Sequence, residues 1–178
     1  MATVNLIPDA NGSVIGWLAQ GDIFHWKCVD DPVGTPDEDA TYVYTNLAAR
    51  EVSINHVTSS VLVGATISNV RVRARMKYSI LGMPPTGVIN IGIRFGAARY
   101  GLPISLILSD TYRDYDADWL VHPLTGLPWT KADIDHMESS LLSVSVINVH
   151  IRCTQIYLIV TYAPSQPVAG KGLVSWTP

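Results

Sequence analysis

The sequence is poor in charged residues and in cysteine. Charged residues make up 15% of its 178 positions and apolar residues 48%, whereas soluble domains carry about a quarter charged residues. A surface with so little charge is typical of a protein that packs against neighbouring subunits, the alternative being a monomer with Ser, Thr and Asn on its outer faces. The net charge of −3 gives no electrostatic reason to expect a nucleic-acid partner, because phosphate binding needs clustered Lys and Arg.

The sequence also lacks the signals of a secreted or membrane-spanning protein. No early stretch combines a basic start with an apolar run, so we expect no secretory signal peptide and synthesis in a cytoplasm. No apolar stretch is long enough to span a bilayer, so we expect no membrane partner. The two cysteines, Cys28 and Cys153, lie far apart in expected strands, where a free Cys behaves as a small apolar residue; a disulfide between them stays open.

The motifs of common enzymes and metal sites are also missing. The sequence has no Cys-x-x-Cys, no His-x-x-x-His, no Gly-x-Ser-x-Gly elbow and no phosphate-binding Gly-rich loop ending in Lys-Ser/Thr. We therefore predict that the protein is not an enzyme, unless a catalytic set assembles from residues far apart in the chain.

The pattern that is present is that of an antiparallel all-β domain. Segments rich in Val, Ile, Tyr and Thr recur between turn residues. In 66–80, apolar residues alternate with Arg71, Arg73 and Arg75, which predicts a half-buried strand with its arginines on one solvated face. Segment 149–162 becomes almost wholly apolar, which predicts a central strand covered on both faces. The remaining expected strands are 23–29, 41–46, 51–57, 88–95, 104–108 and 144–147.

One short α-helix is expected near residues 130–142, covering an end or edge of an antiparallel, jelly-roll-like β-sandwich. Thr130 and Asp133 have the spacing of a capping box, and Trp129 and Ile134 that of a hydrophobic staple. The apolar residues that then recur at helical spacing are Ile134, Met137, Leu141 and Leu142.

Both ends of the chain are expected to be arms around a sandwich domain of residues 22–163. Residues 1–21 hold a turn at Pro8–Gly12, and residues 164–178 hold a Pro/Gly-rich spacer before an apolar tip. Such a spacer suits a tether that reaches a separate surface; the alternative is that Trp176 folds back on its own domain. The expected interface residues are Trp17, Leu173, Val174 and Trp176.

An acidic loop at residues 30–39 is a candidate calcium site. It gathers five carboxylates, and carboxylate oxygens are the ligands that Ca²⁺ prefers. The loop lacks the spacing of an EF-hand and contains two prolines, so a solvated acidic loop is the alternative. The calcium candidates are Asp30, Asp31, Asp37 and Asp39, and no other cofactor is expected.

A second acidic stretch, residues 110–119, is interleaved with aromatic residues. Aromatic rings stack on the apolar face of sugars and carboxylates accept hydroxyl protons, so this composition is a candidate glycan site; the alternative is that the rings pack in the core. The candidate glycan-binding residues are Tyr112, Tyr115, Asp116 and Trp119.

Four motifs are spread, in order, over the chain up to Tyr162. They are Pro8-Asp9-Ala10-Asn11-Gly12 with Gly16-Trp17, Thr41-Tyr42-Val43-Tyr44, Pro123-x-Thr125-Gly126-x-x-Trp129-Thr130-x-x-Asp133, and Arg152-x-Thr154-Gln155-x-Tyr157. Together they resemble the motifs of uncharacterised virion structural proteins of tailed phages and prophages. His122 stands where that group has Asn, and the resemblance does not cover the C-terminal tail.

The resemblance implies a jelly-roll-like module of a virion, serving as a capsid decoration, tail or fibre component. We therefore predict a homo-oligomer that binds other copies of itself and other virion proteins. The alternative is a carbohydrate-binding module of a phage fibre or adhesin.

Overall fold

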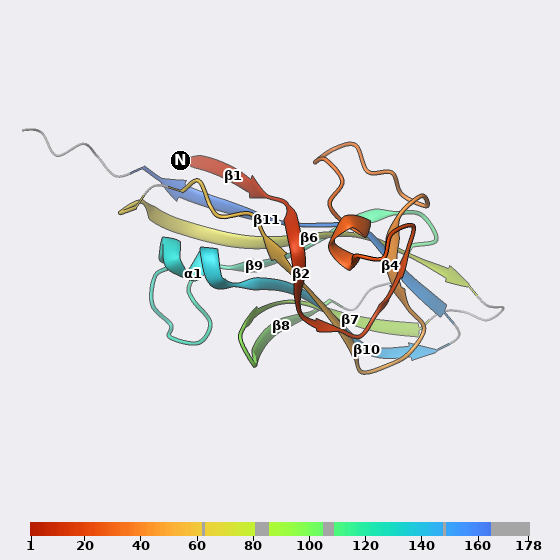
Figure 1. Ribbon diagram of the computed structural model, residues 1–178. Coiled ribbons are helices and arrows are strands. Elements are labelled where there is room, and N and C mark those ends of the chain that lie inside the picture. Colours follow the sequence, from red (N-terminus) through yellow and green to blue (C-terminus); the bar gives the residue numbers. More distant parts are fainter. Residues whose placement is uncertain (62, 81–85, 105–108, 148, 165–178) are drawn as a thin grey trace, which may run out of the picture.

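The chain folds into two antiparallel sheets packed face to face (Figure 1). The computed structural model describes residues 1–61, 63–80, 86–104, 109–147 and 149–164. Sheet A has the order β3-β4-β11-β6-β9, with β1 also pairing with β11, and sheet B has the order β2-β5-β10-β7-β8. The predicted all-β sandwich with one short helix is confirmed.

The strand bounds are as follows. Sheet A contains β1 (Ala2–Leu6), β3 (Leu18–Gln20), β4 (Tyr42–Thr45), β6 (Thr66–Ile80), β9 (Arg113–Trp119) and β11 (Val149–Ala163). Sheet B contains β2 (Pro8–Ile15), β5 (Arg50–His56), β7 (Thr86–Phe95), β8 (Ala98–Ile104) and β10 (Glu138–Ile147).

The core lies between the sheets and is formed by alternate residues of each strand. On β6 the predicted alternation is confirmed, since Val70, Val72 and Ala74 are fully buried between the two layers. Strand β11 pairs with β6 on one side and with β1 and β4 on the other, so the prediction of a central strand is also confirmed. The inward-facing residues of sheet B form the other half of the core: Val52, Ile54, Ile89, Ile91, Ile93 and Leu141.

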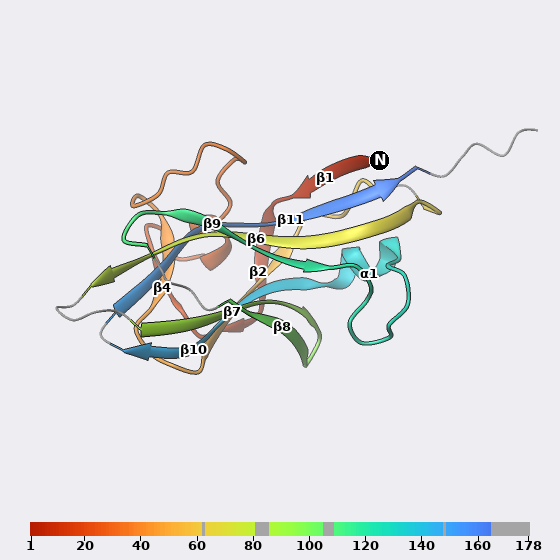
Figure 2. The ribbon, with the colours of Figure 1, turned by 180° about the vertical axis from the view of Figure 1, so that it is seen from behind.

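Helix α1 (Lys131–His136) covers one end of the sandwich (Figure 2). Its predicted capping box is present: Thr130 Oγ1 accepts from the Asp133 amide, and the Asp133 carboxylate accepts from the Thr130 amide at 2.8 Å. The helix is shorter than predicted, because the chain enters β10 at Glu138. There Leu141 faces the core and Leu142 the outer face, so the apolar pair that mimics helical spacing belongs to a strand held between β5 and β7.

The prediction of an N-terminal arm at residues 1–21 is wrong. Strand β1 pairs with β11 in sheet A, whereas β2 pairs with β5 in sheet B, so this segment belongs to both layers. Trp17 is 2% exposed and donates its indole N–H to the Arg50 carbonyl oxygen at 3.0 Å, so it is a core residue and not an interface residue. The predicted interface residues Leu173, Val174 and Trp176 lie outside the described residues.

The predicted strand at 23–29 is also wrong. The segment forms bends and a 3-10 helix, η1 (His25–Cys28), because side chains take up its amides: Asp22 accepts from the Phe24 amide at 2.9 Å and Asn11 from the Trp26 amide at 3.0 Å. Cys28 and Cys153 are both free and buried. Residues 105–108 of the predicted strand 104–108 lie outside the described residues, and its first residue ends β8.

Within the described part of the chain, no helix has the length and hydropathy needed to cross a membrane.

Candidate functional site

A row of cross-strand ion pairs lies on the outer face of sheet A. Strands β6 and β9 place arginines opposite aspartates in register, and we call this row the charge ladder. Its pairs are Arg71–Asp118, Arg73–Asp116 and Arg75–Asp114.

Two of these pairs are bidentate, which fixes both side chains in one plane. Arg73 donates from Nε and Nη2 to the two oxygens of Asp116, at 2.7 Å each. Arg71 donates to both oxygens of Asp118 at 2.8 and 3.1 Å. The Asp116 carboxylate raises the pKa of Arg73 above its ordinary value. Partial burial raises the pKa of Asp118, but the hydrogen bonds from Arg71 and Asn69 outweigh it, so the net pKa is lowered.

The acidic loop, residues 30–39, rises on the sheet A side and is drawn in orange in Figure 1. Gln155 of β11 holds its start, donating its amide to the carbonyl oxygens of Asp31 at 2.8 Å and Pro32 at 3.0 Å. At its end, Glu38 accepts from Arg75 at 2.6 Å. Asp39 accepts from Lys77 Nζ at 2.5 Å and from Arg152 Nη1 at 2.9 Å, and these bonds lower its pKa. The loop is thus tied to sheet A at both ends.

The calcium candidates do not converge. The Asp31 carboxylate accepts from the Asp37 amide at 2.7 Å, whereas Asp39 is occupied by its two cations. Partial burial, together with the neighbouring Asp37 carboxylate, raises the pKa of Asp31. Among the residues that the structure describes, no three His, Cys, Asp or Glu side chains lie close enough to hold a metal ion.

A hollow of about 280 Å³ lies between the acidic loop and the charge ladder. We call it the sheet A hollow. One wall is apolar and comes from the tip of the loop, where Gly34 turns the chain with a φ of +88°. The floor is polar and comes from β6, β9 and β11. The lining residues are Val33, Gly34, Pro36, Arg73, Arg75, Asp114, Gln155 and Tyr157.

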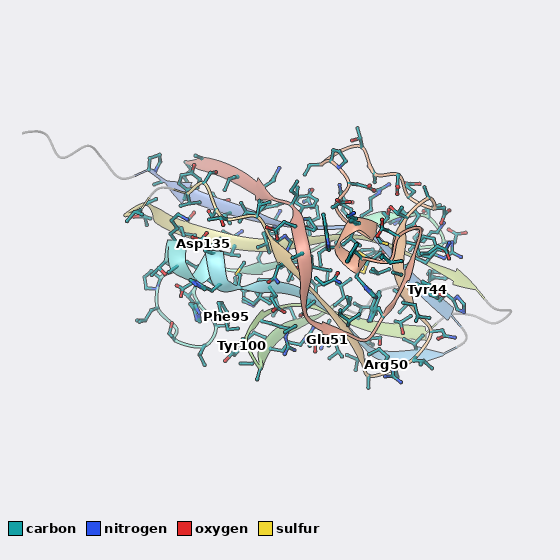
Figure 3. All side chains as sticks on the ribbon, in the orientation of Figure 1. Tyr44, Arg50, Glu51, Phe95, Tyr100 and Asp135 are labelled. Carbon is teal, nitrogen blue, oxygen red and sulfur yellow. The ribbon has the colours of Figure 1, made fainter. Side chains whose placement is uncertain are left out.

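Half-buried rings lie on the same face of sheet A. Tyr44 on β4, labelled in Figure 3, stacks on His150 of β11 with ring centroids 6.0 Å apart and an interplanar angle of 19°. Tyr42 meets Tyr44 edge-on at 5.7 Å, and the Arg152 guanidinium lies 4.6 Å from the centre of the Tyr42 ring. These rings extend the polar face of the sheet with flat apolar surface.

The aromatic residues predicted to bind a glycan do not form a stacking platform. Trp119 is 7% and Tyr112 8% exposed, and Tyr115 packs against the core. The Tyr112 ring lies under Lys77 Nζ, 4.4 Å from its centre, and burial raises the pKa of its hydroxyl. Asp116 alone remains on the outer face, in the charge ladder.

Sequence reasoning missed most of the hollow, namely Arg73, Arg75, Asp114, Gln155 and Tyr157. One signal was available: in 113–119 acidic residues alternate with apolar ones, the complement of the arginine alternation in 71–75. Opposite charges at matching period favour cross-strand pairing.

The outer face of sheet B carries a second, closed polar cluster. Arg94 Nη1 donates to both oxygens of Glu51 at 2.9 Å, and Arg99 Nε lies 3.2 Å from the same carboxylate, labelled in Figure 3. A row of small residues makes room for these guanidiniums, and its members pair across four strands: Ser53, Ser140, Gly92 and Gly101. The three charged side chains are 10–16% exposed, so this cluster offers little to a ligand.

Four apolar side chains stand out from the connection between β9 and α1. Leu120, Val121, Leu124 and Leu127 are 71%, 46%, 60% and 63% exposed, and we call residues 120–128 the apolar loop. Internal bonds hold it, since the His122 amide donates to the Leu127 carbonyl at 2.9 Å and the Gly126 amide to the His122 carbonyl at 2.8 Å. The apolar groups are therefore presented at fixed positions.

A larger hollow, of about 480 Å³, lies between α1 and residues 63–65. Its wall includes Trp129 and Asp135, the latter labelled in Figure 3. The Asp135 carboxylate already accepts from the Ser59 amide at 2.8 Å and from Lys131 at 2.5 Å, so its polar capacity is used within the fold.

No protein-family model and no curated protein matches the sequence. Several solved structures are similar in fold. The CBM36-1 domain of a multidomain xylanase from the hindgut metagenome of Trinervitermes trinervoides has a TM-score of 0.45 and 10% identity, covering 92% of this chain and 100% of that domain. The CBM22-1 xylan-binding domain of Paenibacillus barcinonensis Xyn10C has a TM-score of 0.42 and 11% identity, covering 90% and 94%. TmCBM61 in complex with beta-1,4-galactotriose has a TM-score of 0.38 and 12% identity, covering 80% and 86%.

Proposed function

We propose that the protein binds carbohydrate on the outer face of sheet A, with the sheet A hollow as the main contact. One observation carries the proposal: the hollow sets an apolar wall opposite a polar floor whose groups are fixed. A sugar ring has the matching character, with C–H bonds on its faces and hydroxyls around its edge. Val33 and Pro36 would contact the C–H face, and Arg73, Arg75 and Asp114 would bond the hydroxyls.

The rigidity of the floor supports this proposal. Ordering a long side chain on binding costs about 0.5–1.5 kcal/mol. The cross-strand carboxylates already hold Arg73 and Arg75, and Gln155 already holds the loop. A ligand would therefore meet groups that have lost most of this freedom during folding.

We propose binding without hydrolysis. Glycoside hydrolysis needs a pair of carboxyl groups, one of them kept protonated as a general acid. Among the lining residues that the structure describes, Asp114 is the one carboxylate, so the hollow holds no second carboxyl group to complete such a pair.

The test is a glycan array followed by calorimetry on the best ligand. Val33→Ala removes two methyls from the wall at a side chain 43% exposed, and we expect a fivefold loss of affinity, about 1 kcal/mol. The matched control is Val144→Ala on sheet B, 44% exposed, which should bind like the wild type. Absence of any glycan ligand for the wild-type protein, or equal loss in both variants, contradicts the proposal.

A second candidate function is self-association, and the apolar loop favours it. Four exposed apolar side chains on one ordered loop form a patch that can pair with itself across a twofold axis. In this second proposal the protein is a homo-oligomer, as predicted from the sequence, and serves as a structural component of a virion. In light scattering, Leu124→Glu with Leu127→Glu should lower the mass in solution to that of one chain, and Leu47→Glu, at a side chain 51% exposed elsewhere, should not. A wild-type mass equal to one chain at all concentrations contradicts this second function.

A further inference from the structure

We infer that the ligand of the sheet A hollow is an uncharged saccharide unit, in place of a uronic acid, a sialylated or a sulfated sugar. This inference rests on the proposed carbohydrate-binding function and names its substrate class. It comes from the charge balance of the face and from the size of the hollow.

Every Lys and Arg that the structure describes on β6 and β11 already has a carboxylate partner. A free arginine or lysine is what an anionic sugar needs, because a carboxylate or sulfate that is moved out of water without a partner is strongly disfavoured. The pairs and their shortest distances are Arg71–Asp118 at 2.8 Å, Arg73–Asp116 at 2.7 Å, Arg75–Glu38 at 2.6 Å, Lys77–Asp39 at 2.5 Å and Arg152–Asp39 at 2.9 Å.

The ion-pair network that reaches the floor of the hollow has no net charge. Its five cations pair with five carboxylates: Arg71, Arg73, Arg75, Lys77 and Arg152 with Glu38, Asp39, Asp114, Asp116 and Asp118. An anionic ligand would have to displace a carboxylate from its cation, and a protonated amine would lie against two guanidiniums. A hydroxyl, which both donates and accepts, suits guanidinium and carboxylate groups alike.

Hydrogen-bonding capacity is left for such hydroxyls. Arg75 donates one hydrogen bond from Nη1 and one from Nη2, and each of these nitrogens carries a second N–H group that a neutral sugar oxygen could accept without adding charge. The volume of about 280 Å³ falls below the roughly 300–1,000 Å³ of sites for drug-sized ligands. It suits a single ring, with neighbouring rings of a chain lying over the open sheet.

The experiment compares neutral and acidic glycans of the same backbone by calorimetry, with the wild type and with Asp114→Asn. We expect the wild type to bind the neutral glycan and to bind its uronic-acid or sulfated counterpart at least tenfold more weakly. Asp114→Asn removes one carboxylate beside two arginines, so affinity for the acidic glycan should rise roughly fivefold, the scale of one partly exposed ion pair. The control Asp9→Asn, the same charge change on exposed β2, should alter neither affinity.

Salt dependence gives a second measurement that needs no variant. Binding of a neutral ligand should change less than twofold between roughly 50 and 500 mM salt, because screening acts on charge pairs between ligand and protein. Tighter binding of the acidic glycan by the wild type, weakening steeply with salt, overturns the inference and leaves the carbohydrate-binding function standing. Absence of binding to either glycan overturns both.

Discussion

The outer faces of both sheets carry arginine–carboxylate pairs, but the pairs on sheet B are more deeply buried than those on sheet A. On sheet A the ladder arginines are 24–34% exposed, whereas on sheet B Arg94 and Arg99 are 10% and 14% exposed. The difference comes from the residues beneath. On sheet B, a Cβ at Gly101 would overlap the Arg99 guanidinium, so the glycine lets this side chain lie flat on the backbone. Arginine–carboxylate pairs thus support the fold on one face and remain open to a ligand on the other.

The largest difference in stability between the two faces is expected on substitution of Glu51. Glu51→Gln removes the carboxylate that Arg94 and Arg99 share, and it leaves Arg94 with the more distant Glu138, 3.9 Å from its Nε. Loss of one partner from a buried pair costs about 3–5 kcal/mol. We expect a fall of this size in the free energy of unfolding, measured by urea denaturation. A loss below about 1 kcal/mol would mean that the sheet B cluster is no more structural than the ladder.

The stability of the fold should depend on pH through His56, whose ring bonds to both sheets. Its ring contacts the Leu6 carbonyl oxygen of sheet A at 3.0 Å and Ser139 Oγ of sheet B at 2.8 Å, and burial lowers its pKa to about 4. Between about pH 6.5 and 4 the unfolded chain therefore binds a proton that the folded chain does not. Stability should fall by roughly 3 kcal/mol as the pH drops through this window.

Melting curves of the wild type and His56→Gln test this dependence. The variant should lose the slope between pH 6.5 and 4, while His136→Gln, at an exposed histidine, should keep it. Parallel curves for wild type and His56→Gln would show that His56 does not carry the effect.

The smallest effect on stability is expected when a pair of the charge ladder is broken. Asp118→Asn breaks a bidentate pair whose side chains are 34% and 39% exposed, and exposed pairs contribute about 0.2–1 kcal/mol. A double-mutant cycle with Arg71→Gln should give a coupling energy in this range that shrinks as salt is added. A coupling above 2 kcal/mol that does not respond to salt would place the ladder with the sheet B cluster.

Sequence alone predicts the elements with strong local patterns. The strand over 66–80 and the capping box at Thr130 are confirmed, because alternation and cap spacing act over a few residues. The end of the helix was wrong: Leu141 and Leu142 fit helical spacing, but pairing with β5 and β7 decides their structure. The N-terminal strands were missed because Pro, Asn and Gly obscure their alternation, and β2 pairs irregularly through bulges.

The candidate site was less predictable, because its groups come from four separate parts of the chain. The candidate residue Asp116 lies on the outer face of sheet A, whereas Trp119 turns inward, as alternation in a strand requires. The acidic loop joins the site through pairing with Arg75, Lys77 and Arg152. These contacts depend on topology, which composition does not encode.

The position of β11 has a consequence for the order of events during synthesis. This strand is the neighbour of β1, β4 and β6, and its pairing of Tyr162 with Ala2 joins the last strand that the structure describes to the first. During synthesis, β1, β4 and β6 therefore leave the ribosome before β11, the strand with which all three pair. Contacts between such distant residues form slowly, so sheet A, and with it the sheet A hollow, closes only after β11 has been synthesised.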